Sequence, residues 1–297
     1  MTILAKTLTI FTPTYNRADL LERSFSALCK QDCLDFVWMI IDDGSTDNTK
    51  DAVDEFRKTA PFEIQYYYKE NGGLHTGYNE AISHAETELC MCIDSDDWIA
   101  DHAVSKILSL WEQVKRPDCA GIVALDAYPD GAPTGFIDAN NYVNLNAYDT
   151  THKWAGDRKL VVRTDLYKSV APMPSFNGEK NFNPQYMHYQ IAQNYSFYVL
   201  NEAICIVDYQ ETGMSAGIYR QFTNSPNSWI EYRRMQMVMR PNHWLFILKT
   251  ALHFNSACFL AKRPSSIWKD SPCKLLTTVF LPLGWLLSLY IRKKSHS

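Results

Sequence analysis

Short apolar runs alternate with amphipathic patterns along the first 125 residues. The strand-like runs cover residues 7–11, 36–41, 62–68, 89–93 and 121–125. Between them, apolar side chains recur at helical spacing, as at Val104, Ile107, Leu108 and Trp111. This alternation predicts an α/β fold with a Rossmann-like, mostly parallel sheet and helices on both faces. The ligand crevice of such a sheet lies beyond the carboxyl ends of its strands.

The pattern changes after residue 219, where the chain becomes helical, basic and aromatic. We expect helices over residues 229–239, 242–260 and 275–291. The last would rise about 26 Å at 1.5 Å per residue, less than the roughly 30 Å of a hydrocarbon core. Pro282 and Gly284 also interrupt it. Residues 275–291 therefore have three open alternatives: interfacial or re-entrant insertion, a full membrane span, or packing on the rest of the protein or a partner subunit.

Charge separates the same two parts of the chain. Residues 1–219 carry 17 Lys and Arg against 31 Asp and Glu, whereas residues 220–297 carry 12 against 2. Cations interleaved with aromatic residues suit an anionic membrane surface, and no recognised motif points to nucleic acid. We expect a domain over 1–219, with halves 1–125 and 126–219, and a membrane-associating region over 220–297.

The cysteines and the amino-terminal residues indicate the cellular compartment in which the protein is expected. The eight cysteines include no Cys-x-x-Cys pair, which indicates buried thiols in a reducing compartment. No apolar segment with a cleavage site follows Met1, so we expect no secretory signal. Together with the basic region, this predicts a cytoplasmic protein, peripheral on the cytoplasmic face of the membrane.

An acidic run, Asp94-Ser95-Asp96-Asp97, directly follows the apolar residues 89–93. At the end of a buried strand, its carboxylates would share the crevice at the sheet edge. Hard oxygen ligands suit Mg²⁺ or Mn²⁺, which complete their coordination with water and substrate phosphate. The alternative is a solvated acidic loop with a helix cap.

Two more polar motifs follow predicted strands: TPTYNR at 12–17 and DDGSTD at 42–47. Pro13 could fix a turn that presents Tyr15 to a base, and Arg17 could meet a phosphate. Asp42 could accept a hydrogen bond from the imide N–H of uracil. Strand termination, ordinary packing and a simple Asp-Gly turn are the alternatives, but three motifs at strand ends should converge on one site.

These segments together resemble the family 2 glycosyltransferases, inverting enzymes of the GT-A fold that use nucleotide-activated sugars. The resemblance rests on TPTYNR at 12–17, IIDDGSTD at 40–47, NGGLHTGYNEAI at 71–82 and IDSDDW at 93–98. It has the character of bacterial capsule and exopolysaccharide enzymes.

The resemblance implies roles for particular residues. Pro13, Tyr15 and Asp42 would hold the nucleotide base, and Asp94 would contact ribose or metal. Asp96 would be the principal ligand of a Mn²⁺ or Mg²⁺ ion that acts as a Lewis acid on the leaving diphosphate. The family often has Lys where this chain has Leu74, which puts a cationic phosphate contact from that loop in doubt.

An inverting transfer also needs a base for the acceptor hydroxyl. Related capsule-type sequences carry a Gly-Glu-Lys segment before an apolar helix, which makes Glu179 the first candidate. Relatives often carry Glu near position 185, where this chain has Gln185, so Asp157 and Asp97 are alternatives. A surface ion pair between Glu179 and Lys180 would be the structural alternative.

The sequence thus predicts a metal-dependent inverting glycosyltransferase. It would move a sugar from a UDP-sugar to a hydroxyl of a glycan, expected to be lipid-linked, in cell-surface polysaccharide synthesis. The alternatives are a catalytically silent glycan- or membrane-binding module with this fold, and a sugar-1-phosphate nucleotidyltransferase. The latter needs a Gly-rich, Arg-containing loop after the first strand, where this chain has TPTYNR.

Overall fold

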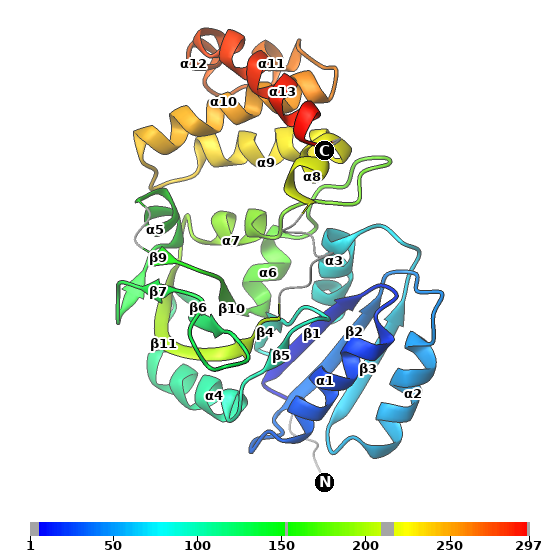
Figure 1. Ribbon diagram of the computed structural model, residues 1–297. Helices are drawn as coiled ribbons and strands as arrows, with labels where there is room; N and C mark the ends of the chain where they lie inside the picture. Colours follow the sequence, from blue (N-terminus) through cyan, green and yellow to red (C-terminus); the bar gives the residue numbers. More distant parts are fainter. Residues whose placement is uncertain (1–5, 152–153, 209–216, 296–297) are drawn as a thin grey trace.

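A computed structural model describes residues 6–151, 154–208 and 217–295 (Figure 1). Among these residues, a mixed sheet has the strand order β3-β2-β1-β4-β10-β6-β11-β5, and β8 pairs with β11. Its strands are β1 (Leu8–Thr14), β2 (Phe36–Asp42), β3 (Glu63–Tyr68), β4 (Leu89–Cys92), β5 (Trp98–Ile99), β6 (Cys119–Ala127), β8 (Tyr142–Val143), β10 (Arg158–Arg163) and β11 (Ser196–Ile206). Strands β7 (Phe136–Ile137) and β9 (Trp154–Ala155) pair separately.

The parallel half of the sheet confirms the expected βαβ series. Strands β1 to β4 pair in parallel, with β1 between β2 and β4. The expected fifth strand lies within β6 but does not adjoin β4. Strand β10 runs between them and is antiparallel to both. The beginning of β10 therefore lies at the sheet edge where β4 and β6 end.

Helices cover both faces of the sheet, as predicted. One face packs on α1 (Ala18–Cys29), α2 (Thr49–Thr59) and α4 (Ala103–Val114). The other packs on α3 (Leu74–His84), α6 (Thr164–Val170) and α7 (Gln185–Ile191). Helix α5 (Leu145–Thr151) adds Leu145 to the second core. Alternation along each strand divides its side chains between the two cores, so Cys90 and Cys92 lie in the second one, while Met91 lies in the first.

Pro13 lies within β1, opposite Ile41 of β2, and does not form the expected turn. Strand β1 pairs with β4 only from Leu8 to Phe11, because β4 ends at Cys92. Backbone groups of Phe11 face β4, since Ile93 N donates to Phe11 O. By alternation, the nitrogen of Pro13 faces the same side, beyond the end of β4. The missing N–H therefore removes no ladder hydrogen bond, which is why proline is tolerated there.

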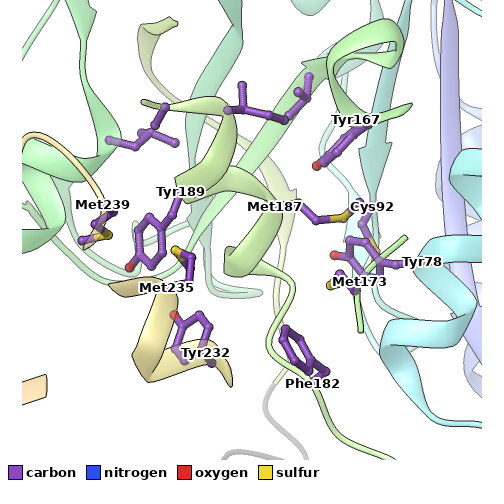
Figure 2. Close-up of a cluster of buried hydrophobic side chains, with 14 of the residues drawn as sticks. Tyr78, Cys92, Tyr167, Met173, Phe182, Met187, Tyr189, Tyr232, Met235 and Met239 are labelled. Carbon is purple, nitrogen blue, oxygen red and sulfur yellow. The ribbon is translucent and has the colours of Figure 1, made fainter. Parts of the chain in front are cut away.

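The C-terminal helices extend the second core. They are α8 (Ile218–Asn224), α9 (Pro226–Val238), α10 (Trp244–Leu260), α11 (Ser266–Lys269), α12 (Lys274–Val279) and α13 (Leu281–Ser295). Figure 2 shows Tyr232 and Met235 of α9 in the cluster that holds Tyr78 and Met187. The expected division at residue 219 thus separates two parts of the sequence but does not divide this core. The expected half 126–219 includes residues 152–153 and 209–216, which lie outside the described residues.

The helix expected over 275–291, with interruptions at Pro282 and Gly284, is two helices that separate at Phe280. Helix α12 ends at Val279 and α13 begins at Leu281. Pro282 lies in the first turn of α13, where backbone N–H groups make no hydrogen bond within the helix, so its missing N–H costs nothing there. Within a continued α12, the same proline would remove a backbone hydrogen bond and break the helix. Across the described part of the chain, none of the helices has the length and apolar character needed to cross a bilayer.

Candidate active site

The acidic run forms a turn at the carboxyl edge of the sheet. Asp97 N donates to Asp94 O at 3.0 Å, which closes the turn after β4. Arg17, which follows β1, places Nη1 3.1 Å from Oδ2 of Asp96 and donates to Ser95 Oγ at 3.1 Å. From α1, Arg23 Nη2 donates to the carbonyl oxygen of Asp96 at 3.1 Å. The motifs after β1 and β4 therefore meet, as predicted, and the contact is an ion pair.

A buried lysine on β10 provides the second positive charge. Lys159 Nζ lies 2.9 Å from Oδ2 of Asp97, 3.8 Å from Oδ2 of Asp94 and 4.0 Å from Oδ2 of Asp126. Its side chain is 11% exposed. Burial raises the pKa of Asp97 to about 6 and that of Asp126 to about 7, although Lys159 opposes both shifts. Asp97, a candidate base, is therefore engaged with Lys159 below the surface.

Asp94 and Asp96 remain the carboxylates suited to a metal. Their side chains are 47% and 19% exposed. Among the residues that the structure describes, no group of three or more His, Cys, Asp or Glu side chains could hold an ion. Two carboxylates fit a divalent cation that takes its other ligands from water and a substrate diphosphate. An ion at Asp96 would compete with Arg17 for Oδ2, so Arg17 would be released towards a phosphate.

The motif after β2 uses its two aspartates differently. Asp42 is 1% exposed; its Oδ1 accepts from Ser45 N at 2.7 Å, and its Oδ2 accepts from the Tyr66 hydroxyl at 2.6 Å. Each carboxylate oxygen can accept a further bond. Asp43 instead orders the glycine loop, accepting from Gly72 N at 2.9 Å and Gly73 N at 2.7 Å.

The motifs after β1 and β2 are joined by Asn16. Its backbone has φ of 50°, and its Oδ1 accepts from Thr46 N at 2.7 Å. Asn16 N donates to Ser45 Oγ at 2.9 Å. Next to this junction, the Tyr15 side chain is 48% exposed and available to a planar ligand. Asparagine tolerates positive φ better than most residues, so the Asn in TPTYNR was a sequence signal for a turn at this position.

Lys69 lies just before the glycine loop, and its ammonium group is held within the protein. Its Nζ lies 2.6 Å from Asp43 Oδ1 and also donates to Thr76 Oγ1 at 2.8 Å. His75 is buried at 1% exposure, and burial lowers its pKa, which disfavours the protonated form that a cationic phosphate contact needs. Gly73, with φ of 92°, packs on the backbone of Lys180, and any Cβ there would overlap that backbone.

Glu179 caps the N-terminus of α9. Its Oε1 accepts from the backbone and side-chain nitrogens of Asn227 at 2.9 and 2.7 Å. Its Oε2 accepts from Ser228 N and Oγ at 2.7 and 2.8 Å. The residue is 8% exposed. These contacts, rather than an ion pair with Lys180, account for the carboxylate and favour a structural role over the expected role as base.

Asp157 is the exposed carboxylate among the three candidate bases. It immediately precedes β10, and its carbonyl oxygen accepts from Asp126 N at 3.4 Å, which places it at the edge with Lys159. It lines a cavity of 270 Å³ whose other walls include Tyr78, Asn183 and Gln185. A larger cavity of 560 Å³ surrounds Glu88 and Arg163 at the opposite edge of the sheet, away from the three motifs.

Sequence reasoning missed Lys159, Asp126 and Asn16. Lys159 was detectable as a cation inside the strand-like run RKLVVR at 158–163. Its contacts were not, because Asp94 and Asp97 follow β4 and Asp126 lies in β6, and no local pattern shows that β10 runs between these strands.

The segment that matches a known sequence family contains the motifs at the ends of β1, β2 and β4. The model of the family described as Glycosyl transferase family 2 matches residues 9–139, which include Asp42, Asp94 and Asp96. Residues 9–139 are a family 2 glycosyltransferase domain. Asp157, Lys159 and Glu179 lie beyond the matched segment.

Curated relatives are similar to the same part of the chain. Chondroitin synthase of Pasteurella multocida is 30% identical over 133 residues, which are 45% of this chain and 13% of the relative. A GalNAc(5)-diNAcBac-PP-undecaprenol beta-1,3-glucosyltransferase of Campylobacter jejuni is 30% identical over 103 residues, 34% of this chain and 33% of the relative. The chain thus spans a third or less of the length of these two proteins.

Solved structures resemble nearly the whole chain. Staphylococcus aureus TarS 1–349 in complex with UDP-GlcNAc has a TM-score of 0.62 and 17% identity, covering 97% of this chain and 92% of TarS. The mannosyltransferase PcManGT of Pyrobaculum calidifontis, with GDP-Man and Mn²⁺, has a TM-score of 0.56 and 16% identity, covering 95% and 87%. These likenesses confirm the GT-A fold.

Proposed function

We propose that this protein is a metal-dependent, inverting glycosyltransferase of cell-surface polysaccharide synthesis. It transfers a sugar from a UDP-sugar to a hydroxyl of a glycan acceptor, which is lipid-linked and reached at the cytoplasmic face of the membrane. The observation that carries the proposal is the pairing of Arg17 with Asp96 beside Asp94, at the sheet edge where Asp157 also lies.

The donor side is built from the motifs after β1, β2 and β4. Tyr15 stacks on the uracil ring, Pro13 shapes the strand that carries it, and Asp42 accepts the imide N–H at a free lone pair. Asp94 and Asp96 hold Mn²⁺ or Mg²⁺, which when bound supplies Lewis-acid stabilisation of the leaving diphosphate. Arg17 then donates to a phosphate oxygen. UDP-GlcNAc in the TarS structure and Mn²⁺ in the PcManGT structure support this choice of donor and ion.

The acceptor side is the 270 Å³ cavity at Asp157. Asn183 and Gln185 offer amide groups to sugar hydroxyls. Asp157 takes the proton from the acceptor hydroxyl as that oxygen attacks the anomeric carbon, on the face opposite the diphosphate. Attack from that face inverts the anomeric configuration.

A donor-hydrolysis screen tests the proposal. The purified chain is incubated with a panel of UDP-sugars and Mn²⁺ or EDTA, and released UDP is measured. We expect release from one or a few sugars, only with the metal. Metal-dependent UDP binding with no hydrolysis and no transfer to any glycan acceptor would support a silent binding module instead. Absence of UDP binding would overturn the donor assignment.

A further inference from the structure

Helices α12 and α13 turn small and hydroxyl-bearing side chains inward. The buried residues are Thr277 of α12 and Gly284, Ser288 and Ile291 of α13. A Cβ at Gly284 would overlap Asn255 of α10, whose Nδ2 donates to Thr277 O at 2.7 Å. Figure 1 shows these helices with α10 at the end of the molecule opposite α1 and α2. Their contact with the protein is therefore close, but it buries few large apolar side chains.

Seven large apolar side chains of the two helices are exposed, while Leu276, Leu281 and Ile291 pack inward. Leu275 and Val279 are four residues apart on α12 and are 83% and 66% exposed, and Leu283 and Leu286 are three residues apart on α13 and are 51% and 53% exposed. Trp285, Leu289 and Tyr290 of α13 are also between 42% and 49% exposed. We call these seven residues the outward apolar face. A helix on a protein surrounded by water exposes fewer large apolar side chains, because its apolar stripe faces the core.

Positive charge borders the outward apolar face at both ends. Lys274 begins α12, and Arg292, Lys293 and Lys294 occupy the last turn of α13, all exposed. Residues 274–295 contain no Asp or Glu. Anionic phospholipid headgroups complement these cations, and Trp285 and Tyr290 have the ring type that favours the headgroup boundary. A second copy of this chain would bring the same cations against one another.

We propose that the outward apolar face inserts into the upper acyl region of an anionic bilayer, with its flanking cations at the headgroups. Neither helix crosses the bilayer, because the 15 residues of α13 rise only about 22 Å. The small inward residues let both helices stay packed on α10 while the outward apolar face is in lipid. The assignment goes beyond the proposed transfer reaction, because it names the surface that holds the protein and uses no residue of the candidate active site.

Vesicle sedimentation tests the assignment. Purified full-length protein is mixed with phosphatidylcholine vesicles, with or without phosphatidylglycerol, and the bound fraction is measured. The unchanged protein should bind the anionic vesicles. Leu283→Ser combined with Leu286→Ser should weaken that binding about tenfold or more, because two apolar groups no longer enter the lipid. Lys293→Gln combined with Lys294→Gln should lower binding to the anionic vesicles only.

A matched pair of single variants controls for general loss of apolar surface. Leu286→Ser and Phe136→Ser remove side chains that are 53% and 56% exposed, but Phe136 lies on β7. Only Leu286→Ser should reduce vesicle binding, and neither should change donor hydrolysis without vesicles. Trp285→Phe should remove the vesicle-dependent blue shift of tryptophan fluorescence.

Three results would overturn the assignment: no binding of the unchanged protein to anionic vesicles, equal binding by Leu286→Ser and the unchanged protein, or a stable dimer that Leu283→Ser with Leu286→Ser dissociates. The last would make the outward apolar face a contact between two copies. Donor hydrolysis in the same samples tests the proposed function separately, because it needs no membrane.

Discussion

Nη1 of Arg17 lies 3.1 Å from Oδ2 of Asp96, so the cation after β1 neutralises the carboxylate after β4. Their side chains are 33% and 19% exposed. Such an ion pair contributes about 1 kcal/mol or less to folding. Because little free energy holds the pair together, Asp96 can exchange Arg17 for a cation, and Arg17 can turn to the phosphate that arrives with it.

Replacing Asp96 should therefore affect the site more than the fold. We expect Asp96→Asn to abolish the metal-dependent part of UDP binding and to lower donor turnover about a hundredfold or more, since the metal ion contributes several kcal/mol of transition-state stabilisation. Calorimetric UDP titrations with Mn²⁺ and with EDTA measure the first effect. Asp101→Asn, at an exposed acidic residue, is the control. Full metal-dependent binding by Asp96→Asn would remove Asp96 from the site.

Asp157→Asn tests the proposed base. Donor hydrolysis, in which water replaces the acceptor hydroxyl, should fall by about a hundredfold or more in kcat, because general-base assistance contributes that much. The KM for the donor should change little, since Asp157 holds no part of the nucleotide. Steady-state rates are compared with those of Asp130→Asn, an exposed aspartate in a turn of the same half of the chain. A near-normal kcat would exclude Asp157.

Glu179→Gln should behave in the opposite way. The amide keeps the shape of the side chain but cannot accept all the bonds that Asn227 and Ser228 donate. The free energy of unfolding should fall by about 2 kcal/mol, as for the loss of a charged helix cap. Denaturant unfolding and the turnover of folded protein are measured on one preparation. A turnover loss far beyond the stability loss would restore Glu179 as the base.

Asp126 should make stability depend on pH. Burial raises its pKa from the ordinary 3.8 to about 7, so between these values the folded state holds a proton that the unfolded state has released. Its contribution is complete below pH about 4 and is lost as the pH rises through about 7, at a slope of at most about 1.4 kcal/mol per pH unit.

Asp126→Asn replaces the titrating carboxyl group with an amide that does not titrate. The unfolding free energy of this variant should therefore vary less with pH, across this range, than that of the unchanged protein. Urea unfolding at a series of pH values, with no metal present, measures the difference. Parallel curves for the two proteins would show that Asp126 titrates normally.

The candidate donor site was largely predictable because its residues lie next to strands with strong local signals. The apolar runs before Asp42 and Asp94 identify buried parallel strands, and such strands end at one edge of a sheet. Local patterns predicted the conformation of Pro13 less well. A proline is tolerated inside β1 only because β4 ends before it, and the sequence around Pro13 does not show where β4 ends. Local patterns placed the interruption of residues 275–291 at Pro282 and Gly284, but the helices separate at Phe280, because Pro282 fits in the first turn of α13.

The sequence by itself determined the alternating elements of the first 125 residues, the convergence of three polar motifs and the basic C-terminal helices. Tertiary structure decided that β10 enters the sheet antiparallel, which brings Asp157 and Lys159 to the edge that holds Asp94 and Asp97. It also decided that Glu179 caps α9 and that Leu275, Leu283, Leu286 and Leu289 face outward. The periodicity of a sequence shows which side chains share one face of a helix or strand. Contacts between segments far apart in the sequence decide what that face packs against.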